Sequence, residues 1–215
     1  MVAARVYRSP RRDAQAGRTR RRVIEAATER FLAHGFAGTT MRAVAAGAEV
    51  SVATVELLFG TKVGLLKAAI DVAIAGDDEP VAVLDRAWAG AARRAESASD
   101  VLALLADVLA AAQQRSSGLV LAVFEGARSD PALAELATQR AAQRRTTAQW
   151  VVDTLARNAS VEEDAVDTLW MLMDPAVYDR LVHRLGWTTD RYRDWFARSA
   201  ARLLLHPDPT REDPP

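Results

Sequence analysis

Apolar residues recur at three- and four-residue intervals along this 215-residue chain, and no segment alternates cleanly between apolar and polar residues. An interval of three to four residues is that of one face of an α-helix, whereas a strand alternates with a period of two. The pattern therefore predicts an all-α fold without a sheet. Half of the residues are hydrophobic, which is enough for one large core or for a small domain and a larger one.

The first helix is predicted to begin at Thr19, a candidate N-cap, and to end at Gly35, because glycine often follows a last helical turn. Val23, Ala27 and Phe31 form its apolar stripe, with Ile24 and Leu32 beside them. Thr40 and Ser51 are candidate N-caps of the next two helices. The second and third helices are predicted over residues 40–47 and 51–58, and a fourth helix over residues 62–75.

Residues 76–80 read GDDEP, a polar and helix-breaking segment that is the predicted domain boundary. Its three acids could be metal ligands, but an acidic linker is the preferred interpretation. Asp130 followed by Pro131 is typical of a helix start, and Pro175 is expected to kink or split its segment. Helices are predicted near residues 81–96, 99–116, 117–128, 131–158, 161–185 and 189–205. Residues 1–18 and 207–215 are predicted to be disordered.

The net charge of zero is distributed unevenly. Residues 1–22 contain eight arginines and one acid, Asp13, so this segment carries +7 and the rest of the chain carries the balancing −7. A basic end on an acidic body is typical of a protein that binds a polyanion through that end. The alternative is a disordered basic tail without a partner.

Several classes of protein are not expected from the sequence. The chain has no cysteine, no run of eighteen apolar residues and no apolar core in its arginine-rich start. We therefore expect a cytoplasmic protein with no disulfide, no membrane partner and no secretory signal. His34, His183 and His206 are too far apart to suggest a metal site, and no phosphate loop, dinucleotide motif or nucleophile elbow is present. An enzyme is not expected, nor is a cofactor or a bound metal.

The segment from Thr40 to Leu58 fits the helix-turn-helix pattern. Two short helices that cross at a steep angle need a small residue where they touch, and Ala45 occupies that position. They also need apolar residues that hold the angle, and these are supplied by Val44, Ala48, Val50, Val55 and Leu58. The second helix would present its N-terminal residues to the major groove of DNA.

With the preceding helix and the restart at Thr61-Lys62, the chain resembles the TetR (tetracycline-repressor-like) family over about residues 19–70. The resembling residues are Ala27, Phe31, Gly35, Phe36, Thr39, Thr40, Arg42, Val44, Ala45, Ala48, Val50, Ser51, Thr54, Phe59, Lys62, Leu65 and Leu66. The resemblance implies an all-helical homodimer. It also implies a DNA-binding domain with a linker helix over residues 19–75, and a larger domain for effector binding and dimerisation over residues 76–206.

Two residues depart from the family pattern. Glu49 occupies a turn position that is usually glycine because it needs a positive φ, at a cost on the order of 1 kcal/mol for another residue. Glu56 stands where the family usually has tyrosine in the recognition helix. Phosphates repel a carboxylate, but it can accept a hydrogen bond from cytosine N4 in the major groove.

The roles expected at the DNA follow from position. The hydroxyls of Thr40 and Thr54 and the ammonium of Lys62, at a helix N-terminus, suit phosphate contacts. Arg42 suits guanine, and the small apolar Val52 and Ala53 suit a thymine methyl group. The predicted DNA-binding set is Thr40, Arg42, Ser51, Val52, Ala53, Thr54, Glu56 and Lys62.

Simpler interpretations exist for some of these residues. Thr40 and Ser51 could serve as N-caps alone, and Val52 could be exposed without a role. The arginine run 20–22 could be a solvated helix start, although contact with the DNA backbone or minor groove is preferred.

The C-terminal part carries candidates for two further sites. Large aromatics at helical spacing usually form core, but four on separate predicted helices could converge on a small apolar or aromatic effector. They are Trp88, Phe124, Trp150 and Trp170. The last helix presents an apolar and small-residue face, and the resemblance implies a two-fold, four-helix interface there. Its predicted interface residues are Tyr192, Phe196, Ser199, Ala200 and Leu203.

The sequence thus predicts a transcriptional repressor that a small-molecule effector releases from a near-palindromic operator. The alternative is a DNA-binding architectural or adaptor protein without an effector. A saturable change in DNA binding caused by a small molecule would distinguish the two.

Overall fold

The computed structural model describes residues 10–206, and its regular elements are helices apart from one isolated bridge between Val161 and Leu205. This confirms the all-α prediction. The chain forms two compact units that divide between Val72 and Ala73, three residues before the predicted boundary. Within the described range, no helix is both long and apolar enough to cross a bilayer.

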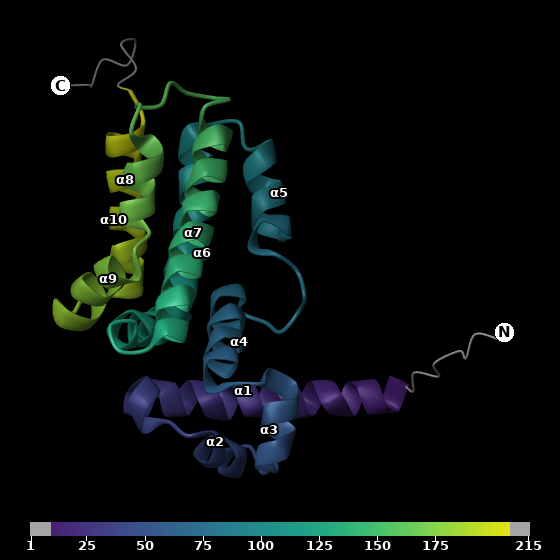
Figure 1. The fold of residues 1–215 in the computed structure, drawn as a ribbon. Helices are drawn as coiled ribbons and strands as arrows, with labels where there is room; N and C mark the ends of the chain where they lie inside the picture. Colours follow the sequence, from purple (N-terminus) through teal and green to yellow (C-terminus); the bar gives the residue numbers. More distant parts are fainter. Residues whose placement is uncertain (1–9, 207–215) are drawn as a thin grey trace. The chain divides into compact units, whose positions relative to one another are not determined.

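The first unit consists of α1 (Pro10–Gly38), α2 (Met41–Gly47), α3 (Val52–Phe59) and most of α4 (Lys62–Ala75). In Figure 1, α2 and α3 lie side by side next to α1. Its core is built from the predicted apolar stripes. The buried residues include Val23, Ala27 and Phe31 of α1, Val44 and Ala45 of α2, Val55 of α3 and Leu65, Leu66 and Ile70 of α4.

The first helix begins at Pro10, nine residues before the predicted start at Thr19. Residues 10–18 of the expected disordered arm are therefore helical, and residues 1–9 lie outside the described range. Pro10 occupies a first helical position, where its missing N–H costs nothing. The alanines, glutamine and arginines that follow favour helix, and Arg18 donates a 2.6 Å hydrogen bond to Gln15. The absence of an apolar stripe in this segment made it look irregular in the sequence.

Gly35 breaks the regular helix where the sequence predicted its end, with φ 65° and ψ −177°. A residue with a side chain is strained at such a φ, and glycine is not. The hydroxyl of buried Thr39 donates to the carbonyl oxygens of Arg30 (3.0 Å) and Gly35 (2.8 Å). It thereby ties the connection between α1 and α2 back onto the last turn of α1.

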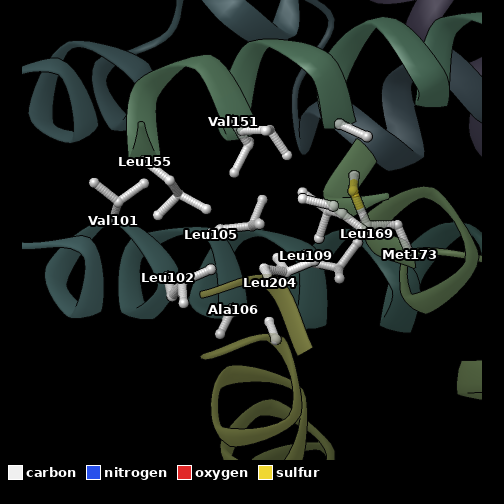
Figure 2. Packing of buried hydrophobic residues seen from close by; sticks show 14 of the residues in the cluster. Val101, Leu102, Leu105, Ala106, Leu109, Val151, Leu155, Leu169, Met173 and Leu204 are labelled. Carbon is white, nitrogen blue, oxygen red and sulfur yellow. The ribbon is translucent and has the colours of Figure 1, made fainter. Parts of the chain in front are cut away.

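The second unit is built on two long antiparallel helices, α6 (Ala98–Gly126) and α7 (Pro131–Leu155). On one side pack α8 (Ala165–Leu172) and α10 (Thr189–Leu204), and on the other side lies α5 (Ala87–Arg94) (Figure 1). Figure 2 shows side chains of α6, α7 and α8 meeting Leu204 of α10 in one apolar core. The labelled members are Val101, Leu102, Leu105, Ala106, Leu109, Val151, Leu155, Leu169, Met173 and Leu204.

The helix predicted over residues 81–96 is interrupted in the structure. The segment 81–96 is a 3-10 turn (Val83–Asp85) followed by α5, because Arg86 between them is extended (φ −80°, ψ 164°). Its guanidinium forms two hydrogen bonds to Asp77, of 2.6 and 2.9 Å. These bonds lower the pKa of the Asp77 carboxyl to about 2.

The predicted break between residues 116 and 117 does not occur, since α6 runs unbroken through Ser116, Ser117 and Gly118. Serine and glycine weaken a helix locally. Here both serines are buried, and the Ser116 hydroxyl donates to the Ala112 carbonyl at 2.8 Å. Tertiary packing therefore overrides the local preference.

The predicted helix 161–185 is split at Pro175, as the sequence suggested. The short α9 (Pro175–Tyr178) begins at that proline, and a π-helical turn over Asp179–Arg184 follows it. The Asp174 carboxylate caps α9 by accepting from the amide of Ala176 at 2.8 Å. In α7 the predicted pairing of Asp130 as N-cap with Pro131 at the first helical position is confirmed.

Candidate nucleic-acid interface

The two helices of the predicted helix-turn-helix both begin at capped, exposed N-termini. The Thr40 hydroxyl accepts from the amide of Ala43 at 3.1 Å, and the Ser51 hydroxyl accepts from the amide of Thr54 at 3.1 Å. The side-chain oxygens of Ser51 and Thr54 also lie 2.8 Å apart. The capping roles of Thr40 and Ser51 are therefore present. Each hydroxyl lies at the surface, where a phosphate oxygen could approach it.

The turn between α2 and α3 contains the strained residue that the sequence predicted. Glu49 has a φ of 54°, and it is the only non-glycine residue with a positive φ in the described range. The amide of Val50 donates to the Ala45 carbonyl at 3.0 Å and closes the turn. The Glu49 carboxylate lies 3.7 Å from the Arg22 guanidinium, with both side chains largely exposed.

Replacing Glu49 by glycine is expected to raise the free energy of unfolding of the first unit by about 1 kcal/mol, because glycine adopts a positive φ without steric cost. The exposed ion pair with Arg22 contributes too little to offset this gain. Urea denaturation followed by circular dichroism measures the change. Glu49→Ala removes the same carboxylate without relieving the backbone, so an equal gain in that variant would contradict the strain argument.

The outward face of α3 carries two of the expected residues, Ala53 and Glu56, and one that was not expected, Leu57. Val55 is fully buried, and the opposite face presents Ala53, Glu56 and Leu57 to solvent. Val52 is half-buried at the edge of this face, as is Thr54. Leu57 is 87% exposed and was not among the predicted DNA-binding residues. Its spacing of four residues from Ala53 was the signal that could have identified it.

Lys62 begins α4, the helix start at which it was predicted, and its ammonium is engaged within the protein. Its ammonium donates to the carbonyl oxygens of Phe36 (2.9 Å) and Thr39 (3.0 Å), and it lies 4.0 Å from the centre of the Phe36 ring. The ammonium that was predicted to contact a phosphate thus already has two acceptors within the protein. The two hydrogen bonds of Lys62 link the start of α4 to the connection between α1 and α2.

Replacing Lys62 by methionine is expected to destabilise the first unit by about 2 kcal/mol, because two carbonyl oxygens lose a charged donor. Chemical denaturation measures the loss. Lys67→Met is the matched control, since Lys67 forms an exposed ion pair with Asp71 one turn later (2.9 Å). That pair contributes a few tenths of a kcal/mol. Equal losses in the two variants would show that Lys62 does not hold the unit together.

The basic residues near α3 come from α1 and α2. The Arg20 guanidinium lies 5.0 Å from the centre of the Phe59 ring at the end of α3. Arg21 and Arg22 are exposed on α1, and Arg42 is exposed in the first turn of α2. Arg20 therefore places positive charge beside α3, and Arg22 does so beside the turn before it, whereas α3 itself has no basic residue.

The structure brings together only two of the four aromatic residues proposed for an effector pocket. The rings of Trp88 and Trp150 meet edge to face, with centres 5.3 Å apart, and the Trp88 indole donates to the Val83 carbonyl at 2.8 Å. Trp170 donates instead to the carbonyl of Ala141, nine residues before Trp150 and so about 13 Å away along α7. Phe124 lies about 22 Å along α6 from Leu109, the last α6 residue of the core that holds the tryptophans. Four convergent aromatics are therefore not found.

The predicted dimer interface is wrong for three of its five residues. Tyr192, Phe196 and Ala200 are fully buried within the second unit, where α10 packs on α6. A surface that binds another copy must be exposed in the isolated chain. Leu203, at 50% exposure, and half-buried Ser199 remain available. The stripe at four-residue spacing marked the face that α10 turns to its own core.

Comparison with known proteins matches residues 23–69 to the family of bacterial regulatory proteins named tetR. A search of curated proteins gave no significant match.

Several solved structures share the fold. A protein from Saccharomonospora viridis described as a transcriptional regulator, in complex with choline, is 15% identical, with a TM-score of 0.62 over 87% of this chain and 98% of that one. A TetR-family member from Streptomyces coelicolor A3 is 21% identical, with a TM-score of 0.56 over 84% of this chain and 96% of that one. The multidrug binding protein EbrR, complexed with imidazole, is 21% identical, with a TM-score of 0.53 over 98% of this chain and all of that one (100%).

The matched segment coincides with the unit that contains the capped α2 and α3, the strained turn and the flanking arginines. Residues 23–69 therefore carry a helix-turn-helix domain similar to that of the TetR family of bacterial regulatory proteins, and the fold of the chain is similar to that of a solved TetR-family structure.

Proposed function

We propose that this protein is a repressor that binds a near-palindromic operator as a homodimer and leaves it when a small molecule binds the second unit. The observation that carries the proposal is the α2–α3 pair, two short helices with capped and exposed N-termini inside the segment that matches the family. One recognition helix of eight residues contacts only a few base pairs, so two copies are needed for a unique site. Two-fold symmetry then makes the operator a near-palindrome of two half-sites about 34–36 Å apart.

The register on DNA is set by backbone contacts in this proposal. The hydroxyls of Thr40, Ser51 and Thr54 lie at the exposed starts of α2 and α3, where phosphates bind favourably. The exposed Arg21 and Arg22 add charge that any phosphate attracts. Arg42 is the residue suited to guanine, because its planar guanidinium matches the O6 and N7 acceptors.

The dimer is proposed to form through the outer faces of α8 and α10. These neighbouring helices carry two of the large apolar side chains that the second unit exposes, Met171 (63%) and Leu203 (50%). Exposed apolar side chains on adjoining helices favour association with a second copy of the same surface.

An effector site in the second unit is supported by buried polar groups and by the solved structures. Gln113 is 4% exposed and donates to the Met173 carbonyl at 2.8 Å, but its Oε1 has no hydrogen-bond partner among the described residues. The same holds for the hydroxyl of fully buried Tyr192. Unpaired buried polar atoms are costly, and a ligand with polar groups would satisfy them. Two of the structures with this fold hold small molecules, choline and imidazole.

The test begins with recovery of genomic DNA fragments bound by the full-length protein, followed by measurement of affinity for the best fragment at several salt concentrations. Arg42→Ala is expected to weaken binding by about 1–3 kcal/mol and to relax preference at one guanine in each half-site. Arg157→Ala, which removes an exposed arginine of the second unit, should leave affinity unchanged. Equal binding of all fragments by the unmodified protein would overturn the proposal.

Release is tested on the same fragment with a panel of small molecules that includes choline and imidazole. A saturable loss of DNA binding supports the repressor with an effector. If no compound in a broad panel acts while specific binding persists, the architectural or adaptor alternative gains support.

A further inference from the structure

The exposed face of α3 is dominated by apolar side chains. Ala53 and Leu57 are four residues apart and lie one above the other, directly opposite the fully buried Val55. Leu57 is 87% exposed, the largest exposure among the large apolar side chains of the described range. Such exposure is unfavourable in water and is relieved when an apolar group covers the side chain.

The recognition helix lacks the residues that read purines. Residues 51–59 contain no arginine, lysine, asparagine, glutamine or histidine. Arginine and lysine are the usual partners of guanine, and asparagine and glutamine are those of adenine. The hydroxyls of Ser51 and Thr54 are engaged with each other and with the cap of α3. The remaining group that can reach a base edge is the exposed carboxylate of Glu56.

A carboxylate selects among bases because it can only accept hydrogen bonds. Cytosine presents its N4 donor to the major groove without an adjoining acceptor. Adenine presents an N6 donor beside the N7 acceptor, whose lone pair repels a carboxylate. Thymine presents a C5 methyl group, which suits an apolar side chain. The two chemistries exposed on α3 therefore both match the C4–C5 edge of pyrimidines.

We propose that α3 reads pyrimidines in each half-site, with Ala53 and Leu57 packed on thymine C5 methyl groups and Glu56 accepting a hydrogen bond from cytosine N4. This inference rests on the proposed DNA-binding function and adds the base chemistry that the helix recognises. In this arrangement Arg42 of α2 keeps the guanine contact proposed above, and the exposed arginines of α1 add affinity through phosphates. The α3 helix, which has no positive charge, adds the discrimination among pyrimidines.

The methyl contacts are tested with duplexes that the full-length protein selects from a random 24-base-pair library. Each thymine of a selected half-site is replaced in turn by uracil, which removes only the C5 methyl group. We expect at least one position where the replacement weakens binding about fourfold, the value of one buried methyl group. Leu57→Ala should weaken binding to the thymine duplex and abolish the uracil effect at that position.

Leu32→Ala is the control, because it removes an exposed leucine from α1, 54% exposed, and should leave both affinities unchanged. An equal uracil effect in the unmodified protein and in Leu57→Ala would overturn the methyl contact. So would the absence of any uracil effect in the unmodified protein.

The cytosine contact is tested by repeating the selection with Glu56→Gln. Glutamine pairs with the N6 and N7 atoms of adenine, so one position of each half-site should change from cytosine to adenine by at least about fivefold. An unchanged base preference would overturn the role of Glu56. If the unmodified protein selected no sequence at all, both the proposed function and this inference would fail. If it bound specific sequences but showed neither the uracil effect nor the change from cytosine to adenine, only this inference would be overturned.

Discussion

Replacing Ala200 by glutamate is expected to unfold the second unit rather than to separate two folded protomers. Ala200 has no exposed surface, and it packs in the core with Phe196 and Leu204 of α10. A buried carboxylate without a partner costs several kcal/mol, and the longer side chain must also displace its neighbours. A domain usually has a free energy of unfolding of only about 5–15 kcal/mol, so a loss of this size is expected to unfold the second unit. Loss of helicity in circular dichroism measures the effect.

Leu203→Glu is the matched substitution three residues later on the same helix. Leu203 is half exposed, so a carboxylate there remains in water and the helicity should persist. If the outer faces of α8 and α10 form the dimer, this variant should sediment as a folded monomer and lose operator binding. A folded Ala200→Glu protein would contradict the burial of α10 described above, and a dimeric Leu203→Glu protein would refute the proposed interface.

The fold class and the helix-turn-helix of α2 and α3 could be predicted because the sequence signals for them are local. Caps at Thr40 and Ser51, the breaks at Gly35 and Gly60 and the apolar offsets of α2 and α3 act within a few residues of each other. The positive φ of Glu49 was also predictable, because the turn geometry requires it whichever residue is present.

The predictions that failed depended on knowing which neighbour a face meets. Tyr192, Phe196 and Ala200 form a good apolar stripe, but a stripe does not reveal whether it packs on α6 or on a second copy. Lys62 was expected at a phosphate because its sequence position shows a helix start. It does not show that two carbonyl oxygens, 23 and 26 residues earlier, would accept its protons first.

The second unit contains an ion pair that no sequence pattern indicated, because its partners are 30 residues apart. The Arg144 guanidinium of α7 donates to the Asp174 carboxylate at 2.7 Å and lies 4.8 Å from the centre of the Trp170 ring. The side chains of Arg144 and Asp174 are 11% and 29% exposed. Burial lowers the pKa of Arg144, while Asp174 opposes this shift by favouring the charged form.

Replacing Arg144 by methionine is expected to lower the free energy of unfolding by about 3 kcal/mol, because the Asp174 carboxylate then loses its partner in a largely buried site. Asp174→Asn should cost a similar amount, although an asparagine can still cap α9. The double variant should lose clearly less than the sum of the two, since it leaves no unpaired charge behind. Urea denaturation of the three variants gives the coupling between the two residues.

Arg145→Met is the control for this cycle. Arg145 is the next residue of α7 and pairs with Asp167, but both side chains are more than half exposed (55% and 64%). An exposed pair of this kind contributes at most about 1 kcal/mol. The contrast between neighbouring arginines therefore isolates burial as the cause of the larger loss. Two results would contradict this account: an equal loss of unfolding free energy in Arg144→Met and Arg145→Met, or strictly additive losses in the Arg144 and Asp174 double variant. Either would show that the Arg144–Asp174 pair stabilises this unit no more than an ordinary surface contact does.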